Sequence, residues 1–225
     1  KIKCFKKDIK EAVSICERIS GKNLNLPILS NILLDAEEKD LKLISTNLEL
    51  GVEIIIPAKI ENKGRITTPS NILNSFLSNI SGNDQINLEV QNNNLIISTN
   101  NNSTFIKSQP VDDFPNLPKL KSDNKFIIPI IDLINGLKMV FYSCSLSIIK
   151  PEISSVYIYS NKTNMLTFAA TDSFRLAEKK FNYFFPELGP ILIPFKTAVE
   201  IIRIFEGKDG KVEVLFNKNQ INIRK

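Results

Sequence analysis

Hydrophobic and polar positions along this chain recur with two different periods, and each period predicts a kind of element. Apolar residues spaced three and four apart predict amphipathic helices. In the first helix, Ile9, Val13 and Cys16 fall on one face, and Asp8 stands where it can cap the helix. The helices expected on this pattern run from Asp8 to about Ile19, from Asn71 to Ile80 after Pro69-Ser70, from Ile130 to Phe141, and from Phe195 to Phe205.

Short apolar or alternating runs between turn residues predict strands. They lie at Lys1–Phe5, Ile28–Asp35, Leu41–Thr46, Leu50–Pro57, Ile86–Val90, Leu95–Ser98, Ser103–Gln109, Phe126–Ile128, Ser154–Tyr159, Leu166–Thr171, Leu176–Asn182, Lys211–Phe216 and Gln220–Arg224. Helices that recur among such strands indicate an α+β fold, in which each unit packs two helices on antiparallel sheets of about eight strands.

The order of elements repeats along the chain. The segment Leu43–Asn47 resembles Phe168–Asp172, and Gly64–Pro69 resembles Gly189–Pro194. In both pairs the second segment follows the first by the same 125 positions. Similar segments that recur at one constant separation predict duplicated domains. Tandem copies of one domain usually build a curved or ring-like assembly rather than one catalytic cleft.

A polar, proline-containing linker follows Asp112 and runs to about Asn124, so we expect one domain over 1–121 and a second over 125–225. The second copy ends soon after Ile221–Ile223, whereas a further strand follows the matching segment of the first copy. Because an unfinished sheet would leave an unpaired edge, we expect the C-terminal part of the second domain to be missing and the natural chain to continue.

Composition adds a weak indication of the partner. The net charge of +5 and a pI near 9.0 favour an anionic partner such as nucleic acid, although abundant Lys, Asn and Ile also fit a coding bias. The widely spaced Cys4, Cys16 and Cys144 are typical of reduced thiols in a cytoplasmic protein. We expect no membrane association, since no apolar run could span a bilayer and no secretory signal is recognisable.

The chain contains no histidine, which removes the commonest general base and the commonest metal ligand. No close cysteine pair indicates zinc, and no glycine-rich phosphate loop indicates a nucleotide, so we expect no metal, no cofactor and no catalysis. An enzyme using Asp112 and Asp113 as an acid–base pair is the alternative. Adjacent residues on an extended chain point to opposite faces, and Phe-Pro-Asn follows, so a linker turn is favoured.

Three further segments carry a resemblance to a known family. They are Leu26–Leu33, Asp113–Leu117 and Ala170–Ala177, in this order and on the 125-residue repeat. Through them the chain resembles the bacterial DNA polymerase III beta subunit, the replicative sliding clamp. The resemblance implies three domains per chain and two chains closed head to tail around duplex DNA. This chain would supply domain one and most of domain two, with the third domain absent.

The resemblance implies a non-catalytic subunit of a DNA polymerase, itself a nucleotidyltransferase. Such a clamp tethers the polymerase as a processivity factor in DNA replication. Its inner surface would hold phosphates weakly and read no bases. Lys and Arg on outward helix faces are the candidates, although any amphipathic helix on a sheet shows such a face. The DNA-facing candidates are Lys7, Lys10, Arg18, Lys22, Lys138, Lys196 and Arg203.

The resemblance also implies an apolar pocket on domain two that binds short peptide motifs of the replicative polymerase, the clamp loader and repair proteins. The matching positions are Ile153, Thr171, Ser173, Phe174, Arg175 and Leu176. Many relatives carry Gly and His where this chain has Ser173 and Phe174, so motif preference is expected to shift. The alternative is that Ile153 and Leu176 are ordinary core residues.

Closure of the homodimer ring would use an exposed edge of domain one. Phe76 and Ile106 are the apolar candidates, unless they belong to the core. A clamp-like docking scaffold that never encircles DNA is the alternative function.

Overall fold

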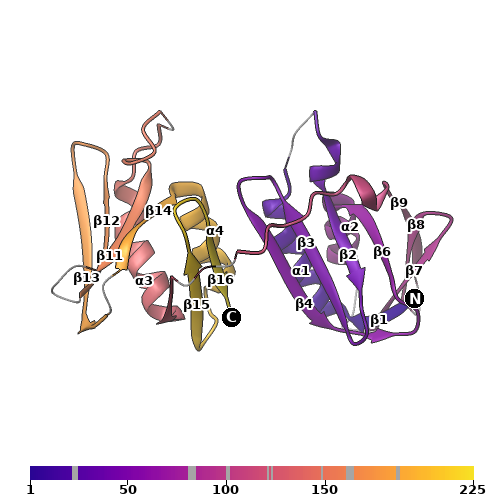
Figure 1. Ribbon diagram of the computed structural model, residues 1–225. Helices are drawn as coiled ribbons and strands as arrows, with labels where there is room; N and C mark the ends of the chain where they lie inside the picture. Colours follow the sequence, from indigo (N-terminus) through magenta and orange to yellow (C-terminus); the bar gives the residue numbers. More distant parts are fainter. Residues whose placement is uncertain are drawn as a thin grey trace. The chain divides into compact units, whose positions relative to one another are not determined.

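In the computed structural model, residues 1–21, 25–80, 85–99, 102–120, 122, 124–147, 149–160, 165–185 and 188–225 are described. The chain divides into two compact units, Lys1–Pro118 and Lys119–Lys225 (Figure 1). Within the described residues, no helix is long and apolar enough to cross a membrane.

The first unit packs helices α1 (Lys6–Ile19) and α2 (Ser70–Asn79) against each other and against antiparallel sheets. One sheet has the order β4-β3-β2-β6 and the other β5-β1-β7-β8-β9. The strands are β1 (Ile2–Phe5), β2 (Asn31–Ala36), β3 (Asp40–Thr46), β4 (Gly51–Pro57), β5 (Lys59–Ile60), β6 (Gly64–Pro69), β7 (Gln85–Gln91), β8 (Asn94–Ser98) and β9 (Ser103–Lys107). Short 3₁₀ helices lie at η1 (Pro27–Ser30) and η2 (Val111–Asp113).

The second unit repeats this plan with helices α3 (Ile130–Val140) and α4 (Phe195–Phe205). Its sheets have the orders β13-β12-β11-β14 and β10-β15-β16. The elements are β10 (Lys125–Pro129), η3 (Phe141–Ser143), β11 (Ser155–Ser160), β12 (Met165–Thr171), β13 (Leu176–Phe184), β14 (Leu188–Pro194), β15 (Lys211–Phe216) and β16 (Ile221–Arg224). The predicted α+β class is confirmed.

Strand register shows that the repeat is structural as well as sequential. Asn31 pairs with Pro69 across β2 and β6, and Ser155 pairs with Pro194 across β11 and β14. Both prolines end a strand, and a helix follows directly. Pro suits this boundary because it lacks the N–H that a ladder or an inner helical turn would need.

Each unit buries its own apolar core, formed where the inner face of its sheets meets its helices. On α1, Ile9, Val13 and Cys16 are fully buried, as the helical period predicts. In the second unit Gly136 on α3 lets the helix approach the Phe168 ring. A Cβ at that position would lie 2.7 Å from ring carbons.

Several predicted boundaries are wrong for local reasons. Helix α1 begins at Lys6, with Phe5 at the N-cap position and no side-chain cap, because strand β1 continues directly into it. Asp8 therefore lies in the first turn, where its charge suits the positive end of the helix dipole. The strand predicted from Ile28 begins only at Asn31, because Pro27–Ser30 forms η1.

Strands β5, β6 and β14 were missing from the predicted set. In β6 the buried positions include Thr67 and Thr68, so an apolar alternation is absent from the sequence. Thr67 is satisfied by donating its hydroxyl to the Gln109 carbonyl oxygen at 2.7 Å. In β14, Pro190 interrupts a run that otherwise reads as a strand.

Candidate peptide-docking site and nucleic-acid interface

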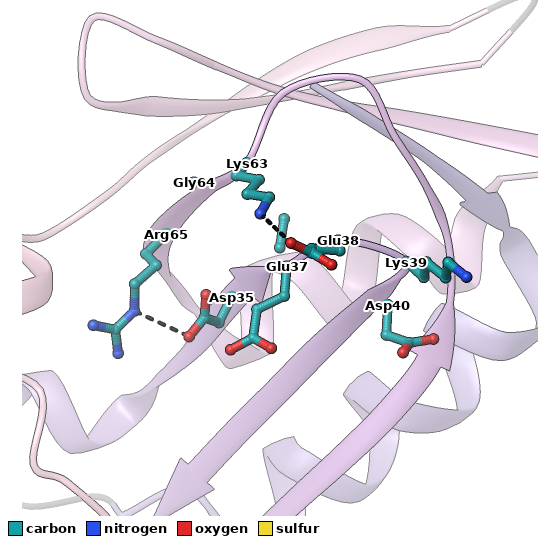
Figure 2. Close-up of a pocket in the computed structure, with 9 residues that line it drawn as sticks. Asp35, Glu37, Glu38, Lys39, Asp40, Lys63, Gly64 and Arg65 are labelled. Atoms are coloured by element: carbon teal, nitrogen blue, oxygen red, sulfur yellow. Dashed lines mark hydrogen bonds and ion pairs between the residues drawn. The ribbon is translucent and has the colours of Figure 1, made fainter.

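A charged hollow of about 710 Å³ opens on the first unit, beside the turn between β2 and β3 (Figure 2). Its charges are largely paired. Arg65 contacts Asp35 at 3.1 Å, and Lys63 contacts Glu38 at 3.0 Å. The described residues contain no group of three or more Cys, Asp or Glu side chains placed to hold a metal ion.

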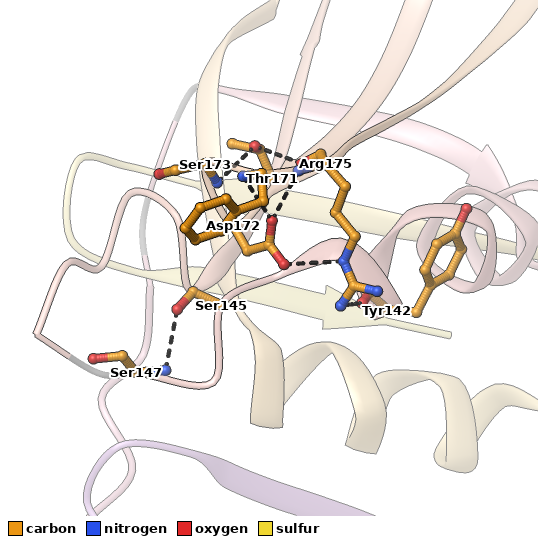
Figure 3. Close-up of polar contacts among 8 residues, drawn as sticks. Tyr142, Ser145, Ser147, Thr171, Asp172, Ser173 and Arg175 are labelled. Carbon is orange, nitrogen blue, oxygen red and sulfur yellow. Dashed lines mark hydrogen bonds and ion pairs between the residues drawn. The ribbon is translucent and has the colours of Figure 1, made fainter.

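The second unit presents a tight turn between β12 and β13, at the predicted peptide pocket (Figure 3). Thr171 Oγ1 donates to the Arg175 carbonyl oxygen at 2.7 Å and accepts from the Ser173 N–H at 3.1 Å. Asp172 Oδ1 accepts from the N–H groups of Phe174 and Arg175, both at 3.0 Å. Ser173 has a φ of +78°, in the left-handed region that non-glycine residues seldom adopt. These side-chain bonds hold the turn in that conformation.

Arg175 forms an ion pair within the turn and a hydrogen bond to η3, the short helix that follows α3. Arg175 Nε donates to Asp172 Oδ2 at 3.0 Å, and its Nη2 donates to the Tyr142 carbonyl oxygen in η3 at 2.8 Å (Figure 3). The Asp172 pKa lies below its usual value, first because backbone N–H groups of Phe174 and Arg175 stabilise the carboxylate, and then because of the Arg175 charge. The guanidinium is therefore held in a fixed place on the surface.

Apolar side chains stand out from this turn. Phe174 is 98% exposed and Leu176 is 72% exposed, so the alternative that Leu176 is an ordinary core residue is wrong. Ile153 is half-buried just before β11, and its carbonyl oxygen accepts from the Ser145 N–H at 2.8 Å. The turn itself brings together every other residue predicted for the pocket.

Part of this surface was not predicted from the sequence. Tyr142, Leu146 and Ile149 are exposed apolar residues in η3 and the segment after it. Asp172, which holds the turn, was also not among the predicted residues. The available signals were the apolar Leu146 and Ile149 within a serine-rich segment, and the acidic residue in the Thr-Asp-Ser turn.

The first unit contains the same turn between β3 and β4. Thr46 Oγ1 donates to the Leu50 carbonyl oxygen at 3.0 Å and accepts from the Leu48 N–H at 3.0 Å. Asn47 Oδ1 accepts from the N–H groups of Glu49 and Leu50, at 3.0 and 2.8 Å. Leu48 has a φ of +76°, matching Ser173. Thus the duplication extends to individual hydrogen bonds, while the side chains on the turn differ.

The predicted DNA-facing residues lie on helix surfaces, but several have acidic neighbours. Lys7, Arg18 and Lys196 are exposed, and Lys10 is half-buried. Lys138 on α3 pairs with Glu206, and Arg203 on α4 pairs with Glu200 at 2.7 Å. The carboxylates reduce the net charge of both faces. Lys22 lies outside the described residues.

The two predicted ring-interface residues are placed differently. Phe76 on α2 is partly buried against the core of the first unit. Ile106 on β9 is only 3% exposed and belongs to that core, so it is not available on the surface. Alternation along the strand instead exposes Phe105, at 71%.

Comparison with known families identifies these units. Residues 1–118 match the DNA polymerase III beta subunit, N-terminal domain, and residues 127–225 match its central domain. The chain belongs to the DNA polymerase III beta subunit family. Family membership accounts for the duplicated units and for their order along the chain.

Individual members of the family are similar to this chain in sequence. The beta sliding clamp of Synechocystis sp. is 30% identical over 186 residues, covering 79% of this chain and 47% of that protein. The beta sliding clamp of Buchnera aphidicola subsp. Rhopalosiphum padi is 28% identical over 218 residues, covering 92% and 57%. The chain thus spans about half the length of these curated relatives.

Solved structures share the fold. The DNA polymerase III subunit beta from Pseudomonas aeruginosa superposes with a TM-score of 0.92 at 20% identity, covering 99% of this chain and 61% of that one. The beta subunit from Thermotoga maritima gives a TM-score of 0.90 at 20% identity, covering 100% of this chain and 62% of that one.

Proposed function

We propose that this chain forms part of a processivity factor that encircles duplex DNA and tethers the replicative polymerase to it. The observation that carries the proposal is the match of both units, in order, to the first two domains of the beta subunit family. The chain would be a non-catalytic part of the polymerase, working in the cytoplasm. Its three buried free thiols suit a reducing compartment.

Weak, sequence-independent contact with phosphates fits the helix faces. The exposed Lys7, Arg18 and Lys196 supply positive charge, while Glu200 and Glu206 moderate it on α3 and α4. Phosphate contacts of this kind carry no base information and are sensitive to salt. A clamp that must slide needs attraction without strong local binding.

Docking of partners is assigned to the Thr171–Leu176 turn. A rigid turn that displays Phe174 and Leu176 beside a fixed Arg175 provides apolar anchors with one polar group. The replicative polymerase, the clamp loader and repair proteins are the proposed partners, each through a short peptide motif. Phe105 and Phe76 are the candidates for the contact that closes a homodimeric ring.

Retention on circular but not linear DNA tests whether the protein encircles the duplex. The protein purified from its own cells, loaded onto nicked circular DNA by its clamp loader, should co-elute with the circle in gel filtration. Cutting the circle once should release it, because a ring slides off a free end. A protein that remains bound to the linear DNA, or never remains on the circle, would instead be the non-encircling docking scaffold.

A further inference from the structure

Residues 109–117 of the first unit, which we call the strap, lie across the outer face of the β4-β3-β2-β6 sheet (Figure 1). At the β6 edge, the Gln109 carbonyl oxygen accepts from the Thr67 hydroxyl at 2.7 Å. At the opposite edge, Leu117 packs over Gly51 of β4, where an added Cβ would lie 2.5 Å from the Leu117 Cδ2 atom. The strap therefore crosses the sheet from one edge strand to the other.

The middle of the strap is held by one aromatic side chain. Phe114 is 6% exposed and packs with Leu33 of β2 and two residues of η1, in a cluster separate from the main core of the unit. After Gln109, the strap has one hydrogen bond within the described residues, from the Phe114 N–H to its own Val111 carbonyl oxygen at 3.0 Å. The strap can therefore leave the sheet without breaking a strand ladder or uncovering the main core.

Register identifies the matching face of the second unit. Leu33 pairs with Thr67 across β2 and β6, as Tyr157 pairs with Leu192 across β11 and β14. Thr67 is fully buried, whereas Leu192 is 44% exposed. A face of the same design is thus covered by the chain's own strap in the first copy and open at Leu192 in the second.

We propose that the strap is an autoinhibitory contact, which closes in cis a face of the first unit that can dock an extended apolar peptide. The partner has the chemistry of the strap itself, with an aromatic and an aliphatic anchor spaced as Phe114 and Leu117 are. Because the strap is tethered to the face, its effective concentration there is high, and a peptide in trans must compete with it. The inference does not depend on whether the protein encircles DNA.

Release of the strap tests the proposal, with binding measured by the fluorescence anisotropy of a labelled peptide. The probe has the sequence of residues 109–119 and is added to the 225-residue chain. Phe114→Ala combined with Leu117→Ala in the chain should raise its affinity for the probe by about tenfold or more, because the competing strap loses both anchors. A probe that carries the same two alanines is the control and should not bind.

Two matched substitutions in the strap-released chain locate the bound peptide. Leu33→Ala removes part of the surface that receives Phe114, and should weaken binding by about tenfold, as loss of a central contact does. Leu33 belongs to the cluster under the strap rather than to the main core, so the unit should still fold. Tyr157→Ala, at the matching position of the second unit, should leave the affinity unchanged.

Other outcomes would overturn the proposal. Equal affinities of the unaltered and strap-released chains for the probe would show that the strap closes no docking face. Binding that is lost on Tyr157→Ala but survives Leu33→Ala would place the peptide on the second unit. Should the strap-released chain fail to fold, Leu117→Ala alone, at a half-buried position, is the milder variant, and an unchanged affinity there would reject the proposal.

Discussion

At the scale of single residues, the two copies of the turn separate structural from functional requirements. Asn47 and Asp172 both accept two backbone N–H groups through one side-chain oxygen. Only Asp172 also holds an arginine, which in turn reaches the Tyr142 carbonyl. An amide is therefore sufficient for the turn, and the carboxylate at position 172 adds the placement of Arg175.

We expect Asp172→Asn to preserve the fold but to release Arg175, and so to weaken binding of a short peptide motif from a partner at the Thr171–Leu176 turn by several-fold. The Asp172 pKa is lowered on folding, so its carboxylate stabilises the native state above the unfolded-state pKa of about 3.9. That contribution is lost as the pH falls through the lower, folded-state value. Urea unfolding of both proteins at neutral and acidic pH should therefore show a stability difference that shrinks in acid.

Gly136 marks a position at which packing forbids any side chain. Gly136→Ala should lower the free energy of unfolding by about 1–3 kcal/mol, because the new methyl group would overlap the buried Phe168 ring. Gly189→Ala in the same unit is the matched control, since a Cβ there meets nothing within 4 Å. Equal urea-unfolding midpoints for the two variants would show that α3 can shift to admit the methyl group without lowering the free energy of unfolding.

At the scale of elements, most helices and strands could be predicted to within one or two residues, because their apolar period is strong. Helix α4 and strand β15 have the predicted bounds. The failures have a common cause. The buried Thr67 in β6 is tolerated because its hydroxyl donates to the Gln109 carbonyl oxygen, and Pro190 is tolerated because β14 is an edge strand. A period in the sequence reveals neither feature.

The helix faces give a prediction for DNA binding. Lys7→Ala combined with Lys196→Ala should weaken binding of the 225-residue chain to a random-sequence duplex. It should also reduce the slope of log affinity against log salt by about 1 for each lost phosphate contact. Lys63→Ala, in the charged hollow of the first unit, is the control. An unchanged slope in the double variant would remove these lysines from the DNA-facing surface.

At the scale of the whole molecule, duplication supplies two units with separate cores, and the differences between them are informative. The first unit covers part of the outer face of its β4-β3-β2-β6 sheet with its own linker, whereas Leu176 and Leu192 on the corresponding face of the second unit are exposed. Because exposed apolar surface of this kind marks interaction sites, we expect partners to bind this face of the second unit.

Exposure on β9 leads to a prediction about assembly. If Phe105 contributes to ring closure, Phe105→Glu should shift the protein purified from its cells from dimer towards monomer, because a charge would be buried at an apolar contact. Sedimentation velocity over a concentration series measures the shift. Lys107→Glu, at the C-terminal end of the same strand, controls for charge alone. A dimer that tolerates Phe105→Glu would place the interface elsewhere.

The sequence by itself determined what depends on neighbours along the chain. This includes the helical and alternating periods, the 125-residue repeat, and the Thr-Asn and Thr-Asp turns whose side chains bond their own backbone. Tertiary structure decided which face of each strand meets a core, and so buried Ile106 while exposing Phe105 and Leu176. It also brought Arg175 to the Tyr142 carbonyl and Leu117 to Gly51. Such contacts join segments that are distant along the chain, and no local pattern encodes them.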